Sequence, residues 1–364
     1  MASIRKHGDS YLNRPEKERH EALAAFGLEN NIPAMKADLQ RYLINYDERF
    51  FESELHNSDY VADTVKKLTE NGHTYEKDGA LWLNTSYLLE QMYRAEGKTS
   101  EDIEKLELKD DVLRRANGFY TYFAADIAYH RNKFEVRGFD RVINIWGADH
   151  HGHVARLKCA LDALGLDGTN RLEIVLMQLV QLVRDGQPVR MSKRTGNAIA
   201  LHDLLDEVSV DAARFFFNSR HSASPIEFDL GLAVRNDSEN PVYYVQYAHA
   251  RIKSILKALA QDNIPTDVKT ADLSLLVEGA ELDLIRDLSR LPEEIRLAAV
   301  QRDPSRLNRY ATQVATVFHK FYTECRIKDA APALREARIL LSCCTAAVIE
   351  NALSCFGVSA PDHM

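Results

Sequence analysis

Residues 189–197, with the sequence VRMSKRTGN, follow an apolar run from Ile174 to Val183 and an Asp185-Gly186 turn. This order predicts a loop that leaves a buried strand. The loop places three cations within five positions, next to two hydroxyl groups and a glycine. A mobile loop that closes on a polyphosphate fits this composition, because Lys and Arg side chains neutralise charge that develops on transferred phosphates. A solvated basic loop fits the charge alone equally well.

The chain before this loop alternates helix and strand. Residues 123–136 have a helical pattern, and Arg141–Trp146 (RVINIW) is typical of a buried strand. Gly147-Ala148-Asp149 then turns into a helix that runs to about Leu164, and a strand-like run leads to the loop. Strand, helix and strand at these lengths predict an α/β fold with a parallel sheet, in which ligands bind at the carboxyl ends of the strands.

The chain after this loop has a helical pattern throughout. Short helices are expected at 201–208 and 211–218, and four or five helices of ordinary length follow from Asn240-Pro241 onward. The change from α/β to all-α near residue 236 marks a domain boundary. We therefore predict two domains, 1–236 and 237–364, and within the first an inserted segment from about residue 36 to residue 115.

The N-terminal region carries further helix and turn signals. A helix is expected from Pro15 to about Leu43, with one apolar stripe made of Ile32, Met35, Leu39, Tyr42 and Leu43. A second helix is expected to start at Ser58 and to bury Val61, Val65 and Leu68. Asp78-Gly79 and Asn117-Gly118 each predict a hairpin turn.

Composition narrows the class of protein. A chain of 364 residues with 45% hydrophobic residues is long enough for two or more domains with hydrophobic cores. No apolar run approaches the ~20 residues of a membrane span, and no apolar segment of the signal-peptide kind follows the first basic residues. The net charge of -8 argues against general binding of nucleic acid but leaves room for a local basic face. No CxxC pair occurs, so reduced thiols in a cytoplasmic protein are expected at Cys159, Cys325, Cys343, Cys344 and Cys355.

Residues 146–153 (WGADHHGH) place three histidines and an aspartate at the predicted end of a strand. His and Asp are common zinc ligands, but His150 and His151 are adjacent and diverge on a helix, and no HExxH spacing or distant Cys pair completes a site. A second interpretation is a helix N-terminus that carries polar groups. We favour a third, a ligand site in which Asp149 accepts a hydrogen bond from a ribose hydroxyl and His150 faces a polar substrate.

Tyr122 and Asp126 are four residues apart at the start of the predicted helix, so both lie on one face near its first turn. A phenol and a carboxylate placed there point at one ligand. A carboxylate is the natural partner of a guanidinium group, whose planar fork pairs with both oxygens. A surface aspartate that is favoured only by the helix dipole explains the same spacing and ranks first without further information.

The helical tail carries basic side chains among aromatic ones. Arg302, Arg306 and Arg309 have the i, i+4, i+7 spacing of one helix face. The cations and aromatic residues around them are Lys320, Arg326, Lys328, Arg335, Arg338, Tyr310, Phe318, Phe321 and Tyr322. A solvated basic face and an RNA-binding face explain this pattern equally well.

Several of these segments resemble one family. Arg190–Arg194 (RMSKR) resembles the Lys-Met-Ser-Lys-Ser loop of class I aminoacyl-tRNA synthetases, and the Thr-Gly-Asn after it resembles arginyl-tRNA synthetases. Ala148–His153 (ADHHGH) is similar to the segment that contacts the ribose of ATP in these enzymes, and residues 117–130 are similar to the segment that binds arginine. Asn240–Ile252 and Ala333–Arg338 (ALREAR) resemble parts of the arginyl-type anticodon-binding domain.

The resemblance implies a Rossmann-type class I catalytic domain followed by an all-α anticodon-binding bundle. It implies ATP-dependent ligation of L-arginine to tRNA(Arg) through arginyl-adenylate, with magnesium carried by ATP and no metal held by the protein. The residues that it assigns are Tyr122, Asp126 and His150 for arginine, Gly147, Asp149 and Met191 for ATP, and Lys193, Arg190 and Ser192 for catalysis. Lys193 would stabilise the α-phosphate, and Arg190 would assist the leaving pyrophosphate.

For tRNA, the resemblance implies a splayed anticodon loop whose bases stack on aromatic side chains and whose backbone contacts arginines. The ending 357–364 (GVSAPDHM) also fits the family, whose terminus lies near the anticodon. The implied tRNA-binding residues are Tyr243, Tyr247, Arg251, Arg302, Arg306, Arg335 and Met364. A cytoplasmic monomer without membrane contact is expected.

One departure from the family separates two hypotheses. The family carries a His-Ile-Gly-His-type motif and a small N-terminal domain, and neither occurs in this sequence; His150–His153 imitates the motif by letters only, inside the ribose-contacting segment. We therefore expect the carboxyl-terminal portion of a synthetase with an incomplete catalytic domain. It is either an arginine–tRNA ligase or a tRNA-binding fragment without ligase activity. A metal-dependent hydrolase that uses His150, His151 and His153 is a third hypothesis.

Overall fold

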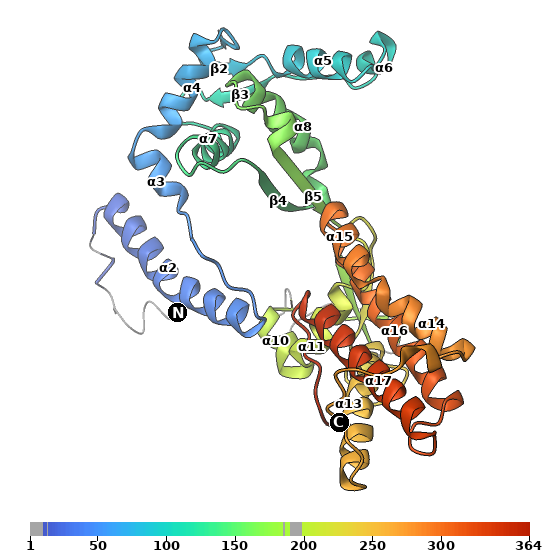
Figure 1. The fold of residues 1–364 in the computed structure, drawn as a ribbon. Coiled ribbons are helices and arrows are strands. Elements are labelled where there is room, and N and C mark those ends of the chain that lie inside the picture. Colours follow the sequence, from blue (N-terminus) through green and yellow to red (C-terminus); the bar gives the residue numbers. More distant parts are fainter. Residues whose placement is uncertain (1–9, 13, 185, 190–198) are drawn as a thin grey trace. The chain divides into compact units, whose positions relative to one another are not determined.

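The computed structural model describes residues 10–12, 14–184, 186–189 and 199–364. Its internal contacts divide the chain into two compact units, whose elements are labelled in Figure 1. We call Asp47–Leu179 with Ser222–Pro225 the α/β unit, and Met1–Tyr46, Val180–His221 and Ile226–Met364 the helical unit. The domain boundary between residues 236 and 237 stays a prediction, because this division follows contacts and not the order of the chain.

A β–α–β arrangement forms the centre of the α/β unit. Strand β4 (Val142–Gly147) pairs in parallel with β5 (Leu172–Met177), from Val142 opposite Leu172 to Gly147 opposite Met177. The crossover contains the 3-10 turn η1 (Ala148–His150), α8 (His151–Ala163) and the short α9 (Gly168–Arg171). The predicted strand, helix and strand are therefore confirmed, and Gly147–His153 lies at the carboxyl end of β4.

Helix α7 (Tyr122–Glu135) packs against α8 and starts at a well-defined cap. The Thr121 hydroxyl accepts a hydrogen bond from the Ala124 N–H at 3.3 Å and donates one to the Val112 carbonyl at 2.7 Å. A capping threonine satisfies a backbone donor that the first turn of a helix leaves free. The buried side of the helix joins the core of the α/β unit, which includes Phe123, Ile127, Leu157 and Leu161.

A three-stranded antiparallel sheet precedes α7 in the chain. Its strands, in spatial order, are β1 (Thr74–Lys77), β2 (Ala80–Leu83) and β3 (Asp111–Arg114), with α5 (Thr85–Ala95) and α6 (Ser100–Glu104) between β2 and β3 in sequence. The hairpin predicted at Asp78-Gly79 is confirmed, and both residues have the positive φ that such a two-residue turn requires. The hairpin predicted at Asn117-Gly118 is only a tight reversal with one isolated bridge between Arg114 and Tyr120, because α7 begins directly after it.

Helices α3 (Glu52–Asn57) and α4 (Tyr60–Glu70) complete the α/β unit. As predicted, α4 buries Val61, Val65 and Leu68. The prediction of Ser58 as its N-cap is wrong. The Ser58 hydroxyl donates to the Glu54 carbonyl at 2.6 Å and so closes the end of α3 instead.

The helical unit contains a small sheet of its own. Strand β6 (Val180–Arg184) pairs antiparallel with β7 (Gln187–Pro188) and in parallel with β8 (Ile226–Asp229). The apolar run from Ile174 to Val183 is therefore two strands of different sheets, not the single strand that was predicted. The break falls at Gln178, whose N–H donates to the Ser222 carbonyl at 2.9 Å, and at Leu179, whose side chain is 89% exposed.

Helices form most of the remaining helical unit, and the predicted helices after the loop are confirmed. The described elements are α2 (Glu16–Arg41), α10 (Leu201–Glu207), α11 (Val210–Phe217), α12 (Leu230–Ala233), α13 (Pro241–Gln261), the 3-10 turn η2 (Leu273–Leu275), α14 (Gly279–Ser289), α15 (Leu291–Gln301), α16 (Ser305–Glu324) and α17 (Pro332–Ser354). One hydrophobic core extends from Leu204 to Val358, with Phe215, Phe228, Phe318 and Phe321 fully buried in it.

The helix predicted from Pro15 to about Leu43 is confirmed as α2, but the predicted apolar stripe is not buried. None of its residues is buried, and Met35 of the stripe is 59% exposed. Arg41 in the last turn donates to the Asp206 carboxylate at 2.6 Å and to the Leu205 carbonyl. Polar contacts at the C-terminal end of the helix therefore attach it to α10, and apolar spacing does not predict such contacts.

Helix α17 is, among the described helices, long and apolar enough to cross a membrane by length and composition alone. However, 56% of its most apolar window is buried inside the protein. Its residues Leu341, Ile349 and Leu353 belong to the core of the helical unit. Burial of this extent is typical of a core helix.

A buried ion pair joins α17 to α14. Arg338 Nε donates to Glu281 Oε1 at 2.7 Å, and Arg338 Nη1 donates to the Arg326 carbonyl at 2.6 Å. Glu281 is fully buried and Arg338 is 8% exposed. Arg338 is thus held inside the bundle and does not belong to an exposed basic face, although the sequence pattern grouped it with one.

The ion pair makes a prediction about stability. Arg338→Met leaves the Glu281 carboxylate buried without its partner, so we expect the free energy of unfolding to fall by about 3–5 kcal/mol in urea denaturation. Adding Glu281→Leu should restore most of the loss, because an apolar pair of similar volume tolerates burial. As a control, Arg296→Met removes an exposed pair with Glu293 and should leave the midpoint unchanged. Equal midpoints for Arg338→Met and Arg296→Met would contradict the assignment.

Candidate functional site

The first turn of α7 presents Tyr122 and Asp126 on one face. The Tyr122 side chain is 81% exposed, and the Asp126 carboxylate is about half exposed. The Thr121 cap and the burial of Phe123 fix this turn in place. A phenol and a carboxylate are therefore both open to one ligand, as the four-residue spacing predicts, and their role in binding arginine stays a prediction.

Asp126 contacts the segment that follows β4. Its Oδ2 lies 3.1 Å from Nε2 of His153 in α8. The His153 ring packs against Trp146, with centroids 5.5 Å apart, and against Phe123 at 5.2 Å. Two segments that the sequence singled out separately, one around Tyr122 and Asp126 and the other at residues 146–153, therefore meet within the α/β unit.

Gly147, Asp149 and His150 lie where β4 ends. The Asp149 carboxylate approaches Gly147 closely, and a Cβ atom at position 147 would displace this exposed side chain from its place. The side chains of Asp149 and His150 are both exposed, with Oδ2 and Nε2 3.7 Å apart. An exposed carboxylate at the carboxyl end of a parallel strand is well placed to accept a hydrogen bond from a ribose.

The histidines of this segment do not converge on one point. His150 lies beside Asp149, whereas His153 is turned toward Asp126. Within the part of the chain that the structure describes, no group of three His, Cys, Asp or Glu side chains is arranged to hold a metal ion. Among the described residues, His150 and His153 therefore contact two different carboxylates and do not share one centre.

The predicted phosphate loop lies outside the described residues. This applies to Arg190, Met191, Ser192 and Lys193, whose roles stay predictions. The strands that lead into it are described: Gly186 has a positive φ of 72°, and the Val189 N–H donates to the Leu182 carbonyl at 2.8 Å. A short antiparallel turn between β6 and β7 thus precedes the loop.

A second candidate surface lies on α13 and α16. The rings of Tyr243 and Tyr247 are stacked, with centroids 6.2 Å apart and an interplanar angle of 7°. Arg251 Nη1 donates to the Tyr247 hydroxyl at 2.6 Å, and the Arg251 guanidinium lies 4.4 Å from the centroid of the Tyr322 ring. Three of the predicted tRNA-binding residues are therefore neighbours on one helix.

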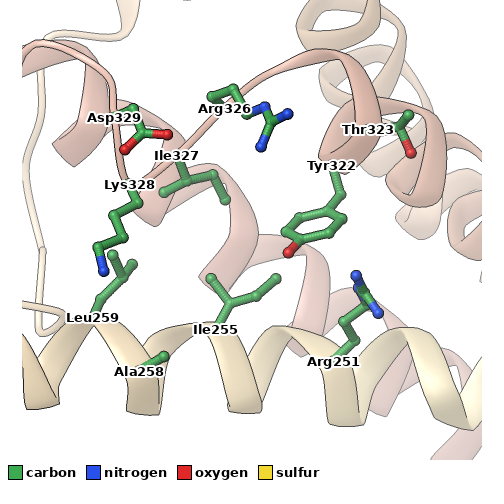
Figure 2. Close-up of a pocket in the computed structure, with 10 residues that line it drawn as sticks. All are labelled: Arg251, Ile255, Ala258, Leu259, Tyr322, Thr323, Arg326, Ile327, Lys328 and Asp329. Atoms are coloured by element: carbon green, nitrogen blue, oxygen red, sulfur yellow. The ribbon is translucent and has the colours of Figure 1, made fainter.

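A cavity of about 580 Å³ opens beside this cluster. Figure 2 shows the Tyr322 ring between the side chains of Arg251 and Arg326. The apolar part of the lining comes from Ile255, Ala258, Leu259 and Ile327. An aromatic face with an apolar floor and cations at the rim has the features that bind an unstacked nucleobase.

Arg302 and Arg306 do not share a helix face, so that prediction is wrong. Arg302 ends α15 in the left-handed conformation (φ 52°), and Arg306 lies in the first turn of α16. Asp303-Pro304 separates the two helices, because proline has no backbone N–H with which to continue the hydrogen bonds of the first helix. Arg306 also donates to the buried Glu294 carboxylate at 2.9 Å.

The last predicted tRNA-binding residues lie near the cavity and at the C-terminus. Arg335 Nη1 lies 3.4 Å from the Lys328 carbonyl, in the loop that lines the cavity. Met364 is exposed at the end of a tail that contacts α13, where His249 Nδ1 lies 3.0 Å from the Pro361 carbonyl oxygen. The tail therefore runs along the same helix that carries Tyr243, Tyr247 and Arg251.

Comparison with known proteins decides the family. The model for tRNA synthetases class I (R), catalytic domain, matches residues 29–224, and the model for the DALR anticodon binding domain matches residues 245–364. The chain belongs to the arginyl-tRNA synthetase family. The predicted fold class, a class I catalytic domain with a helical anticodon-binding domain, is confirmed by these matches.

Relatives and solved structures support this family. The chain is 51% identical to an arginine–tRNA ligase of Caldanaerobacter subterraneus, over 98% of this chain and 61% of that protein. An arginyl-tRNA synthetase structure from Campylobacter jejuni has a TM-score of 0.85 and 33% identity, and covers 100% of this chain and 74% of that one. The arginyl-tRNA synthetase structure from Thermus thermophilus shares the fold, with a TM-score of 0.79 and 21% identity. It covers 100% of this chain and 69% of that one. The chain thus spans 61% of the length of that curated relative.

The α/β unit also contains a buried polar cluster that the sequence motifs did not predict. The Asn144 side chain of β4 donates from Nδ2 to His130 Nε2 at 2.6 Å. Its Oδ1 accepts a hydrogen bond from Lys133 Nζ at 3.3 Å. His130 Nδ1 lies 2.8 Å from the Asp126 carbonyl, so Nδ1 donates and Nε2 accepts. Burial lowers the pKa of His130 to about 4, and burial together with Arg137 lowers that of Lys133 to about 8. Asn144, a polar residue inside the otherwise apolar run VINIW (142–146), was the available signal in the sequence.

The buried histidine predicts a pH dependence of stability. In the folded protein His130 stays neutral down to a pKa of about 4, whereas the unfolded chain takes up this proton near pH 6.5. The unfolded state binds more protons between these values, so the free energy of unfolding should fall by ~3 kcal/mol as the pH drops through this window. His130→Gln keeps a donor toward the Asp126 carbonyl and should flatten this slope in urea denaturation. His151→Gln, at an exposed position, should keep it; equal slopes in all three proteins would rule out the assignment.

Proposed function

We propose that this chain carries the arginine and ribose sites of an arginine–tRNA ligase and serves the ATP-dependent ligation of L-arginine to tRNA(Arg). The observation that supports this most is the meeting of the first turn of α7 with the end of β4, where Asp126 and His153 lie 3.1 Å apart. Asp126 then faces the amino acid while Asp149 faces the nucleotide. Two separate carboxylates on neighbouring elements suit an enzyme that joins these two substrates.

Selection of arginine follows from charge and shape. In this proposal the guanidinium binds the Asp126 carboxylate, the Tyr122 hydroxyl adds a hydrogen bond, and His150 contacts polar atoms of the substrate. The planar guanidinium matches a carboxylate through two parallel hydrogen bonds, whereas the ammonium of lysine is a compact point charge. The site therefore favours arginine over lysine by geometry as well as by charge.

The chemistry proceeds in two steps. A carboxylate oxygen of arginine attacks the α-phosphorus of ATP, and the bond from this phosphorus to the oxygen that bridges to the β-phosphate breaks. Arginyl-adenylate forms, and pyrophosphate departs with the magnesium ion. A ribose hydroxyl at the tRNA 3′ end then attacks the carbonyl carbon, and AMP leaves. In this proposal Gly147, Asp149 and Met191 hold ATP, Lys193 and Ser192 stabilise the α-phosphate, and Arg190 assists the leaving pyrophosphate.

For the helical unit we propose binding of the tRNA anticodon loop. An unstacked base enters the cavity beside Tyr322, while Tyr243, Tyr247 and Arg251 contact its neighbours. The further proposed contacts are Arg302, Arg306, Arg335 and Met364. We place the protein in the cytoplasm as a monomer, where its free cysteines stay reduced.

Binding of tRNA without ligation is the second candidate function. The observation that favours it is the cluster of Tyr243, Tyr247 and Arg251 beside the cavity, all of which belongs to the helical unit. Arginine-dependent exchange of labelled pyrophosphate into ATP, measured with tRNA(Arg) present, distinguishes the two functions. Exchange by this chain supports the ligase and excludes the fragment, whereas tRNA binding without exchange supports the fragment.

Asp126→Asn tests the arginine site. The substitution keeps the size of the side chain but removes the charge that faces the guanidinium, so we expect the arginine concentration for half-maximal exchange to rise roughly 100-fold. The half-saturating ATP concentration should stay unchanged. Asp140→Asn, at an exposed position after α7, serves as the matched control. An unchanged arginine requirement in Asp126→Asn would remove the assignment.

Arg251→Ala tests the tRNA surface. Loss of the guanidinium beside Tyr322 should weaken binding of tRNA(Arg) by about tenfold and make the salt dependence of binding less steep by about one unit. Filter binding at several salt concentrations measures both quantities. Arg296→Ala removes an arginine that pairs with Glu293 on the exposed side of α15 and should leave both unchanged. Identical losses in the two variants would mean that general charge, not this site, holds the tRNA.

A further inference from the structure

The Asp126 carboxylate lies at one end of a chain of polar contacts that begins at β3. Asp111 contacts Arg156, Arg156 contacts His153, and His153 contacts Asp126. We propose that His153 is a positioning residue, which donates to one lone pair of Asp126 Oδ2 and so orients the carboxylate with Oδ1 and the second lone pair of Oδ2 open to the guanidinium of the substrate. This inference rests on the proposed function, since it requires that Asp126 binds arginine.

The donor and acceptor roles along the chain follow from the chemistry of the guanidinium. Arg156 Nη2 lies 3.4 Å from His153 Nδ1, and a guanidinium only donates hydrogen bonds. His153 Nδ1 therefore accepts, and the proton of the neutral imidazole sits on Nε2. From there it donates to Asp126 Oδ2 at 3.1 Å. The contact with Arg156 thus selects the tautomer that binds Asp126.

Arg156 is itself fixed in place. Its Nη1 donates to Asp111 Oδ1 at 2.6 Å, at the start of β3, and its Nε donates to the Gly152 carbonyl at 3.0 Å. Its guanidinium also lies 5.7 Å from the centroid of the Phe123 ring. The group that sets the His153 tautomer therefore has partners on β3, α7 and α8, and all of them lie in the α/β unit.

The His153 ring has little freedom to turn away. It is packed edge-on against Phe123 at an interplanar angle of 68° and tilted by 38° against Trp146. Its side chain is 17% exposed, whereas the Asp126 side chain is 48% exposed. A mostly buried, packed donor therefore holds a carboxylate that is about half exposed. The carboxylate is oriented before the substrate binds, so less conformational entropy is lost on binding.

The neighbouring histidines do not duplicate this role. His150 lies 3.7 Å from the Asp149 carboxylate, on the nucleotide side of the proposed site. His151 is exposed at the first residue of α8. Among the three histidines of the segment, the contact with the arginine-binding carboxylate comes from His153 alone.

Two variants and one spectroscopic measurement test this inference on the chain itself. His153→Phe keeps an aromatic ring against Phe123 and Trp146 but removes both hydrogen bonds. His153→Gln restores a donor for Asp126 and an acceptor for Arg156. We expect binding of L-arginine, measured by calorimetry, to weaken about tenfold in His153→Phe and to return to within about threefold of wild type in His153→Gln. The control His151→Phe should bind like wild type.

Nitrogen NMR of the histidine rings provides a readout that needs no substrate. The wild-type chain should show His153 neutral with its proton on Nε2, and Asp126→Asn should shift that signal. A proton on Nδ1, or unchanged arginine binding in His153→Phe while Asp126→Asn has lost it, would overturn the inference and leave the proposed arginine site standing. Absence of arginine binding by the wild-type chain, with the Nε2 tautomer present, would instead overturn the proposed site and with it this inference.

Discussion

The alternation of side chains along β4 is the constraint on which the proposed arginine site depends. Val142, Asn144 and Trp146 lie on the face toward α7, while Ile143 and Ile145 lie on the opposite face and are 43% and 68% exposed. Asn144 must find partners inside, and it finds them in His130 and Lys133 of α7. The strand therefore contacts α7 directly through Asn144. Trp146 packs on His153 of α8, and His153 in turn contacts Asp126 in the first turns of α7. The orientation of Asp126 follows from both contacts.

Much of this fold follows from local sequence, because its signals are short in range. The run RVINIW, the Asp78-Gly79 turn and the Pro241 start of α13 each match a rule of strand, hairpin or helix formation, and each element forms where expected. Some of the errors come from contacts between distant segments. The run from Ile174 to Val183 changes sheet because Gln178 bonds to Ser222, and nothing within the run encodes that partner.

In the candidate site, too, local features were predictable from sequence and contacts between separate segments were not. Spacing places Tyr122 and Asp126 on one helix face, and the motif ADHHGH marks the end of β4, so the members of each group were predictable. The contact by which His153 joins the two groups was not predictable, since it depends on the angle at which α7 packs on α8. Likewise, Arg338 belongs in sequence to a basic pattern that fits either a solvated face or an RNA-binding face, but its burial beside Glu281 makes it structural. Periodicity predicts which face of a helix a residue occupies, but it does not predict which segment packs against that face.

The net charge of -8 also bears on the proposed tRNA surface, because a surface that is acidic on average repels phosphate. Many arginines of the helical unit already have carboxylate partners: Arg306 and Arg290 both donate to Glu294, and Arg338 donates to Glu281. Arg251 instead donates to the phenol of Tyr247, which leaves its positive charge uncompensated in that contact. Affinity for tRNA is therefore expected to rest on a few such cations and on stacking against Tyr322, rather than on a broad basic face. A binding site of this kind favours splayed single-stranded bases over a regular duplex.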